Sequence, residues 1–315
     1  MPVPAHLPEA SHPHFATASE LPARLRLLRW LGHQTWAPRG TDRLLRALHH
    51  PDSGERFLFE VDFFGKRYRG DLAQYIDWLV FSYGAAPHCE LSLLRAATTY
   101  LRSQRPGPVH FIDVGANVGH HTLFMSGVAD DVVAFEPFPA TCAQLQSKLA
   151  LNALENVQVF PIGLGEEDGE LPYFASTGAN SGIGSFLEHG TAEYRATSTL
   201  SVRRGDPLFT ELGLPRMDIL KVDVEGFEPQ VLRGLREHIQ RDRPIILTEL
   251  MDSTRASFGS EASLRECFYP GASFHGVEGP FQSHRYRLTP FDFAHTEEIL
   301  VLPPEHAAFA QLPQP

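Results

Sequence analysis

The chain has 315 residues, 43% of them hydrophobic, and a formal net charge of −11 at pH 7. This length suits one large domain with an appendage, and the hydrophobic share supports a packed core without extensive disorder. The acidic balance disfavours nucleic acid and anionic membranes as partners, because phosphate binding depends on Lys and Arg.

The N-terminal third is predicted to form a cap in front of the main domain. Residues 1–20 are rich in Pro, His and Ala and are expected to be disordered. Apolar residues then recur at helical or alternating spacing through residues 21–107, which we interpret as the cap. Its predicted elements are a helix, a hairpin turned at Gly65 and two further helices, over residues 21–31, 56–68, 71–81 and 90–101.

Strands and helices alternate from residue 108 to the C-terminus at 315, the predicted main domain. The predicted parallel strands cover 109–114, 131–135, 157–161, 219–222 and 244–248. Helices are expected over 118–128, 140–152 and 229–239, further strands over 171–175 and 199–203, and an antiparallel C-terminal edge pair over 273–277 and 298–302. This order predicts a Rossmann-like, doubly wound α/β fold with a mostly parallel seven-stranded sheet. The Gly/Ser-rich stretch 178–185 is either a loop over the active site or a plain connector.

A glycine-containing turn follows the first strand of this domain and is typical of nucleotide binding. Gly115, Asn117 and Gly119 lie in the sequence D-V-G-A-N-V-G, between the strand and a helix that is expected to begin near Val118. Asp113 precedes the turn and would repel a pyrophosphate, and the G-x-G-x-x-G spacing of dinucleotide folds is missing. The turn therefore favours a ligand with an ammonium group and no phosphate, such as S-adenosylmethionine (SAM).

Acidic residues end the following strands and are expected to share one rim with Asp113. Glu136 lies roughly 20 residues beyond the turn, the usual interval for a carboxylate that binds ribose hydroxyls. Pro137 and Phe138 follow it and offer an apolar surface for adenine, and Gly163 and Leu164 are expected by analogy to lie at the adenine edge.

The strand 219–222 leads into the densest acidic block, M-D-I-L-K-V-D-V-E-G-F-E. Asp223, Glu225 and Glu228 belong to it, and Glu249 ends the next strand. Because ligands of open parallel sheets gather at the carboxyl ends of the strands, these carboxylates should face one site. A rim of carboxylates suits a cationic cofactor.

These motifs together resemble a known family. D-V-G-A-N-V-G, A-F-E-P, K-V-D-V-E-G-F-E with L-R-G after it, and P-I-I-L-T-E are similar to the FkbM-type SAM-dependent methyltransferases over about residues 108–302. The resemblance implies a class I methyltransferase fold and, most often, O-methylation of a sugar or natural-product hydroxyl. One departure is visible: members usually carry a Leu-Asp pair before the fourth strand, and V-R-R-G-D keeps only Asp206.

Methyl transfer to a hydroxyl needs a positioned acceptor and a general base. Asp223 is the first choice for that base, with Glu225 and Glu249 as further choices and His120 and His121 as outsiders. The alternative for both histidines is that they line the cofactor edge. Asp223, Glu225 and Glu249 could also hold Mg²⁺ through oxygen ligands, although no dedicated metal site is predicted.

Other functions remain open from the sequence alone. An N-methyltransferase on the same fold, an NAD-dependent oxidoreductase and a non-catalytic binding protein are the alternatives to an O-methyltransferase. The expected partner is a small-molecule or carbohydrate acceptor. Three isolated cysteines, no secretion signal and no membrane-length apolar run favour a cytoplasmic location.

Overall fold

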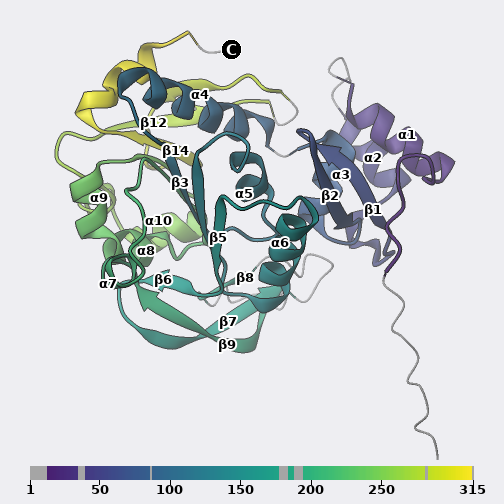
Figure 1. Cartoon of the computed structure of the whole chain (residues 1–315), viewed down its shortest axis with the longest axis horizontal. Coiled ribbons are helices and arrows are strands. Elements are labelled where there is room, and N and C mark those ends of the chain that lie inside the picture. The colour runs from purple at the N-terminus through teal and green to yellow at the C-terminus, as the bar shows by residue number, and fades with distance from the viewer. Residues whose placement is uncertain are drawn as a thin grey trace, which may run out of the picture.

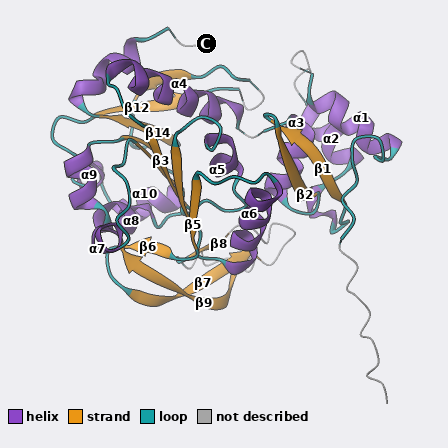
Figure 2. Cartoon of the chain, in the orientation of Figure 1, coloured by secondary structure: helices purple, strands orange, loops and turns teal. Residues whose placement is uncertain are grey.

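The computed structural model of the chain describes residues 13–34, 40–85, 87–176, 184–187, 194–280 and 283–313. A large sheet with helices on both faces forms the body of the molecule, with a small second sheet beside it (Figure 2). A lobe of helices and one hairpin projects from this body (Figure 1). Among these described residues, no helix has both the length and the apolar character needed to span a bilayer.

The large sheet has eight strands in the order β13-β12-β14-β11-β10-β3-β4-β5. Their bounds are β3 His110–Val114, β4 Asp131–Phe135, β5 Val157–Phe160, β10 Ile219–Val222, β11 Ile245–Glu249, β12 Ser273–Glu278, β13 Arg287–Pro290 and β14 Glu298–Leu302. From β5 to β11 the neighbours are parallel, whereas β14 runs antiparallel to both β11 and β12. The chain order reverses between β3 and β10, which is where ligands of doubly wound folds bind.

The predicted fold class is confirmed, including the antiparallel C-terminal edge. The sheet has eight strands where the sequence predicted seven, because β13 pairs with β12. This edge strand has few buried side chains and ends at Pro290, so it lacks the apolar alternation that reveals a strand in a sequence.

A separate hydrophobic core lies on each face of the sheet, since alternate strand residues point to opposite sides. Phe111 packs in the core beneath α4 (His88–Gln104), α5 (His120–Met125) and α6 (Pro139–Leu151). Its neighbour Ile112 packs in the other core. The helices of that face are α7 Gly205–Glu211, α8 Glu228–Gly234, α9 Arg236–Asp242, α10 Asp252–Phe258 and α11 Glu261–Arg265.

The single helix predicted over 229–239 is two helices, α8 and α9, which meet after Gly234. A Cβ atom at Gly234 would lie 1.8 Å from the carbonyl oxygen of Gly165, so only glycine permits this approach. Gly165 belongs to the small second sheet, and the close contact therefore fixes α8 against that sheet.

The second sheet has the order β6-β9-β7-β8. Its strands are β6 Gly163–Gly165, β7 Gly169–Ser176, β8 Gly184–Ser185 and β9 Tyr194–Arg204, and they contain the strands predicted over 171–175 and 199–203. Gly163 and Leu164, expected in a loop, are paired in β6. Of the Gly/Ser-rich stretch 178–185, residues 178–183 lie outside the described residues.

The projecting lobe contains most of the predicted cap. It comprises α1 Ala23–Gly32, α2 Thr41–Leu48, the 3₁₀ turn Pro51–Ser53, β1 Leu58–Phe63, β2 Lys66–Asp71 and α3 Tyr75–Tyr83. Of the expected disordered segment, residues 1–12 lie outside the described residues, whereas Ala16 forms a parallel bridge with Phe59 of β1. The helix α4, at the end of the predicted cap, packs on β10 and α5 of the main body. A second 3₁₀ segment, Pro304–Gln311, follows β14.

A buried ion pair joins the lobe to the main body. Lys148 of α6 is 2% exposed, and its Nζ lies 3.5 Å from Oδ1 of Asp77 in α3. The same Nζ donates a hydrogen bond of 3.0 Å to the carbonyl of Val118, which lies within the glycine turn. The lobe, the helix α6 and the turn are therefore held together at one point.

Candidate functional site

A cavity of about 710 Å³ lies at the carboxyl ends of β3, β10 and β11. This is the rim on which the sequence placed the site, and the volume is typical of small-molecule sites. Six carboxyl side chains line it: Glu90, Asp223, Glu225, Glu249, Glu297 and Glu298. The other lining residues used below are Tyr75, Ile76, Leu79, Gly115, Asn117, His120, His121, Lys221 and Thr248.

The glycine turn forms one wall of the cavity through a run of left-handed backbone conformations. Gly115, Asn117 and Gly119 have φ values of 83°, 51° and 86°. The amide of Gly115 donates to the carbonyl of Phe135 at 3.0 Å, and a Cβ atom on Gly115 would lie 1.8 Å from the carbonyl oxygen of Asp223. The turn is therefore held between the ends of β4 and β10, where only glycine fits.

Glu136 braces this turn from the end of β4. It is 5% exposed, and its carboxylate accepts hydrogen bonds from the amide of Asn117 at 2.8 Å and from the amide of Phe138 at 2.9 Å. The hydroxyl of Thr141 donates a third bond at 2.9 Å. Burial raises the pKa of Glu136 against these three donors. Glu136 lies beside the turn and does not line the cavity itself.

Asp113 lies beneath the turn and is fully buried. One carboxyl oxygen, Oδ2, accepts a bond of 2.6 Å from the hydroxyl of Thr122. The other, Oδ1, has no hydrogen-bond partner among the described residues. A buried acceptor without a donor is costly, so this oxygen suits a donor supplied by a ligand.

Lys221 and Asp223 form an ion pair at the end of β10, with 2.8 Å between Nζ and Oδ2. Burial alone would raise the pKa of Asp223, but the ammonium of Lys221 and its hydrogen bond hold that pKa below the usual value. Burial opposes the charge of Lys221, and the carboxylates of Asp223, Asp113 and Glu90 outweigh it, so the pKa of Lys221 is raised. Both residues are therefore charged at neutral pH.

Three carboxyl groups close to this ion pair hold protons more strongly. Burial, with the charges of Asp223 and Glu228, raises the pKa of Glu225 to about 7. Burial, again with neighbouring carboxylates, raises the pKa of Glu249 to about 9 and that of Glu228 to about 7. Glu225 also has a positive φ of 54°, a strained conformation that is common at functional sites.

Three of these carboxyl groups come close together. Oxygen atoms of Asp223, Glu228 and Glu249 lie within 4.8 Å of one another. The set differs from the one weighed for Mg²⁺ in the sequence, because Glu228 replaces Glu225. Glu228 already accepts bonds from the amide of Val224 at 2.8 Å and the hydroxyl of Thr254 at 2.9 Å.

The far wall of the cavity comes from α4 and β14, and the sequence did not predict it. Glu90 of α4 lies 3.0 Å from Nε2 of His121, and Glu90 also hydrogen-bonds to Glu298 of β14. Burial and the carboxyl group of Glu90 raise the pKa of Glu298 well above its usual value. On β11, Thr248 is 1% exposed, and its hydroxyl has no partner among the described residues.

The structure divides the predicted site residues into two groups. Gly115, Asn117, His120, Asp223, Glu225 and Glu249 line the cavity. Asp113, Gly119, Glu136, Pro137, Phe138, Gly163 and Leu164 lie outside its lining. In the second group, Phe138 stacks on Tyr173 of β7 with ring centroids 5.1 Å apart.

Lys221 was not predicted as a site residue, although the sequence contains a clear signal for it. It is a lysine inside an otherwise apolar buried strand, at the i, i+2 spacing that places it on the same side as Asp223. Buried lysines are rare without a charged partner, so the pattern itself signals an ion pair. Glu90 gave no such signal, because its partners are remote in the sequence.

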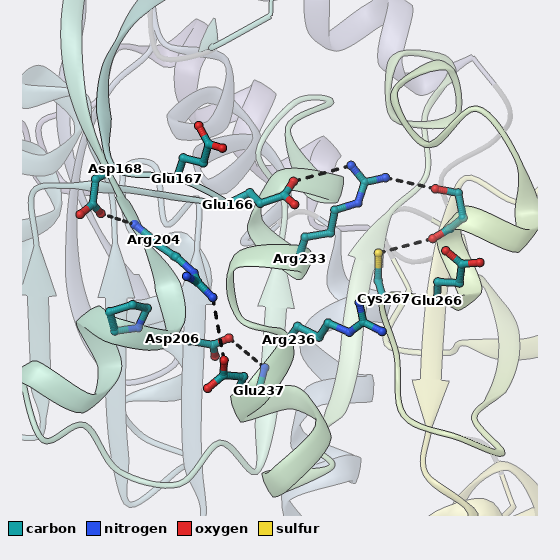
Figure 3. Close-up of a pocket in the computed structure, with 12 residues that line it drawn as sticks. Glu166, Glu167, Asp168, Arg204, Asp206, Arg233, Arg236, Glu237, Glu266 and Cys267 are labelled. Atoms are coloured by element: carbon teal, nitrogen blue, oxygen red, sulfur yellow. Dashed lines mark hydrogen bonds and ion pairs between the residues drawn. The ribbon is translucent and has the colours of Figure 1, made fainter.

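A second pocket, of about 840 Å³, lies away from this rim and is lined by residues of β6, β9, α7, α8, α9 and α11 and their connections (Figure 3). Some of its charged side chains are paired with each other: Arg204 lies 3.9 Å from Glu237, and Arg233 lies 3.8 Å from Glu166. None of the residues predicted for the site lines this pocket. It is therefore a hollow distinct from the site that the sequence predicts.

The fold and the acidic rim define a methyltransferase of the class I type, and comparison with known proteins gives the family. The model of the Methyltransferase FkbM domain matches residues 113–288, which is more than half of the chain. The chain belongs to the FkbM methyltransferase family.

Similar proteins include three methyltransferases. Methyltransferase 1 of Beauveria bassiana is 30% identical, over 51% of this chain and 72% of its own. Hexuronic acid methyltransferase AglP of Haloferax volcanii is 32% identical, over 41% of this chain and 50% of its own. The 2-O-methyltransferase NoeI of Sinorhizobium fredii is 26% identical, over 47% and 65%. This chain thus spans less than two thirds of the latter two.

One solved structure that is similar is the methyltransferase FkbM from Methylobacillus flagellatus KT. It is 18% identical, with a TM-score of 0.41, over 66% of this chain and 48% of its own.

Proposed function

We propose that this chain transfers a methyl group from SAM to a hydroxyl of a sugar or small natural product. The observation that carries the proposal is the rim itself: a glycine turn and six carboxyl side chains line one cavity. A cavity with this charge suits a cationic cofactor and would repel the pyrophosphate of a dinucleotide.

The residues around the turn fit SAM in three respects. Asp113 adds a buried carboxyl group directly beneath the turn, outside the cavity lining, and this favours a cationic ligand above the turn. Glu136 keeps its carboxylate at the end of β4, beside the turn, where a ribose would be bound. Phe138, stacked on Tyr173, offers an aromatic surface next to it. We therefore place the nucleoside toward β4 and the amino-acid tail over the turn.

When bound, SAM supplies an activated methyl group on a sulfonium. The protein then has to hold the acceptor hydroxyl in line and take its proton. Of the three bases predicted, Glu225 has the pKa best matched to neutral pH, about 7. Asp223 is held in its ion pair and is a weaker base, so we assign it to orienting the acceptor. Glu249, with a pKa of about 9, carries its proton at neutral pH.

The choice of oxygen as the methylated atom is supported by relatives. NoeI is named a 2-O-methyltransferase and AglP a hexuronic acid methyltransferase. Methylation of nitrogen on the same fold is the alternative, and product analysis separates the two. Mg²⁺ remains an alternative for Asp223, Glu228 and Glu249, and would show as loss of activity with EDTA.

The first test is calorimetric titration of the full chain with S-adenosylhomocysteine (SAH) and, separately, with NAD. We expect micromolar binding of SAH and none of NAD. Binding of NAD alone would favour an oxidoreductase. Binding of neither would contradict the cofactor assignment and favour a protein that keeps the fold without the chemistry.

A further inference from the structure

The cavity extends from the glycine turn to β11 and β14, and the β11–β14 part has its own chemistry. The ribose residue Glu136 lies on β4, on one side of β3. The carboxylates of Glu249 and Glu298 lie on β11 and β14, on the other side. β14 is three strand spacings from β3, about 14 Å along the sheet. The β11–β14 part of the cavity is therefore open to the methyl acceptor.

Carboxyl groups dominate the acceptor part. Glu249 and Glu298 are paired in register on adjacent antiparallel strands, Glu297 is exposed beside them, and Glu90 reaches them from α4. Within the described part of the chain, Lys221 is the only Lys or Arg that lines the cavity, and Asp223 already binds it. No cation is left to balance an anionic acceptor.

A second, independent feature shows that this part is built to hydrogen-bond a ligand. The hydroxyl of Thr248 is buried on the cavity wall without a partner in the described residues. A native protein rarely leaves such a group unpaired, so a ligand donor or acceptor is expected there. Opposite, the lobe contributes Tyr75, Ile76 and Leu79, an apolar wall against which a ring can pack.

We infer that the acceptor is a hydroxylated ring compound that carries a protonated amino group, such as an amino sugar or an amino-cyclitol. The ammonium group lies among Glu249, Glu297 and Glu298, and a hydroxyl reaches Thr248. Acceptors with a carboxylate or phosphate at the same position are disfavoured, because they would meet Glu297 and find no unpaired Lys or Arg among the described lining residues. This inference rests on the proposed methyl transfer and names its substrate class.

The crowding of these carboxyl groups supports the inference. Glu249 and Glu298 face each other across adjacent strands, and Glu90 hydrogen-bonds to Glu298, so several carboxyl groups gather around one place in the cavity.

The test uses three probes on one scaffold: glucosamine, glucose and glucuronate, each titrated into the full chain saturated with SAH. We expect glucosamine to bind about tenfold tighter than glucose, the size of one hydrogen-bonded ion pair, and glucuronate to bind more weakly than glucose.

A charge reversal sharpens the test. Glu297→Lys changes an exposed carboxylate at the cavity edge, outside the groups assigned to catalysis, and should invert the order of glucosamine and glucuronate. Glu155→Gln, an exposed carboxylate before β5 at the opposite edge of the sheet, is the matched control and should leave the order unchanged.

The result that would overturn the inference is equal binding of all three probes, tighter binding of glucuronate by the unmodified chain, or no binding of any. SAH binding, measured first, separates this failure from failure of the methyltransferase proposal. An amine preference that disappears after EDTA treatment would also overturn the inference. The amine would then be bound by a metal ion in the cavity and not by the carboxyl groups directly.

Discussion

The ammonium of Lys221 lies 2.8 Å from the carboxylate of Asp223, two residues further along the same strand end. Lys221 is 3% exposed and also offsets the charge of the fully buried Asp113. One lysine thus interacts with two aspartates, one below the glycine turn and one at the cavity wall. The acidic rim is stable without a ligand only because this cation is inside it.

Replacing Lys221 with methionine should therefore destabilise the protein. Removing one partner of a buried ion pair leaves the other uncompensated, which costs about 3–5 kcal/mol. The double variant Lys221→Met with Asp113→Asn should recover part of this loss. Urea unfolding of the original protein, the two single variants and the double variant measures the coupling between Lys221 and Asp113. If the losses in unfolding free energy of the two single variants simply add in the double variant, the coupling is contradicted.

Glu136→Ala should weaken SAH binding by roughly 1.5–3 kcal/mol, since hydrogen bonds to a charged acceptor are lost. Two interactions of Glu136 contribute to this loss of affinity: the proposed contact with the ribose and the hydrogen bond that its carboxylate accepts from the amide of Asn117. Isothermal titration measures the affinity, with Glu170→Ala, an exposed carboxylate of β7, as the control. Unchanged affinity in Glu136→Ala would contradict the assignment of the ribose-binding site to Glu136 at the end of β4.

Activity should depend on pH through Glu225. Its pKa of about 7 means that the carboxylate is mostly protonated below that pH and accepts a proton only above it. The ratio kcat/KM should rise as the pH increases through about 7 and then level off. Glu225→Gln should lower kcat by about 10²–10⁴ and abolish the rise. A rise that persists in Glu225→Gln and disappears in Asp223→Asn would make Asp223 the base.

Stability without ligand should fall as the pH rises. Glu249 has a folded pKa of about 9 against 4.5 for the free residue, because burial and the charges of Asp223, Glu225 and Glu228 disfavour its ionised form. Between these two values the unfolded chain releases a proton that the folded chain keeps. The free energy of unfolding therefore decreases with pH over this window.

Glu249→Gln should remove this part of the pH dependence. The variant should melt at a higher temperature than the original protein at pH 8 and at nearly the same temperature at pH 4. Each kcal/mol corresponds to about 2–4 °C for a domain of this size. Thermal melts from pH 4 to 9, with Glu155→Gln as the control, measure the difference. If the melting temperatures of Glu249→Gln and the original protein change with pH in parallel, the prediction is contradicted.

The sequence predicted the central strands closely because their signal is local. The runs 131–135, 219–222 and 298–302 match β4, β10 and β14 at both ends, since each is a short apolar run between polar turns. The second sheet was not predicted, because β6 pairs with β9 across a long insertion and three residues carry little pattern. Such pairing depends on tertiary structure.

The same distinction holds for the site. Gly115, Asp223 and Glu249 were predicted because each follows a recognisable strand, and the end of a parallel strand is a defined place. Glu90 could not be predicted, since its role depends on how α4 crosses β10 and meets β14. Lys221 was within reach, as a charged residue in a buried strand.

The family match begins at Asp113, whereas Tyr75, Ile76, Leu79 and Glu90 of the cavity wall precede it in the chain. The two sides of the cavity are thus encoded in separable stretches. A change of acceptor during evolution can take place by drift or exchange of the N-terminal stretch, while the stretch that carries the glycine turn keeps its sequence. Chimeras joined near residue 108 are a direct route to new acceptor preferences.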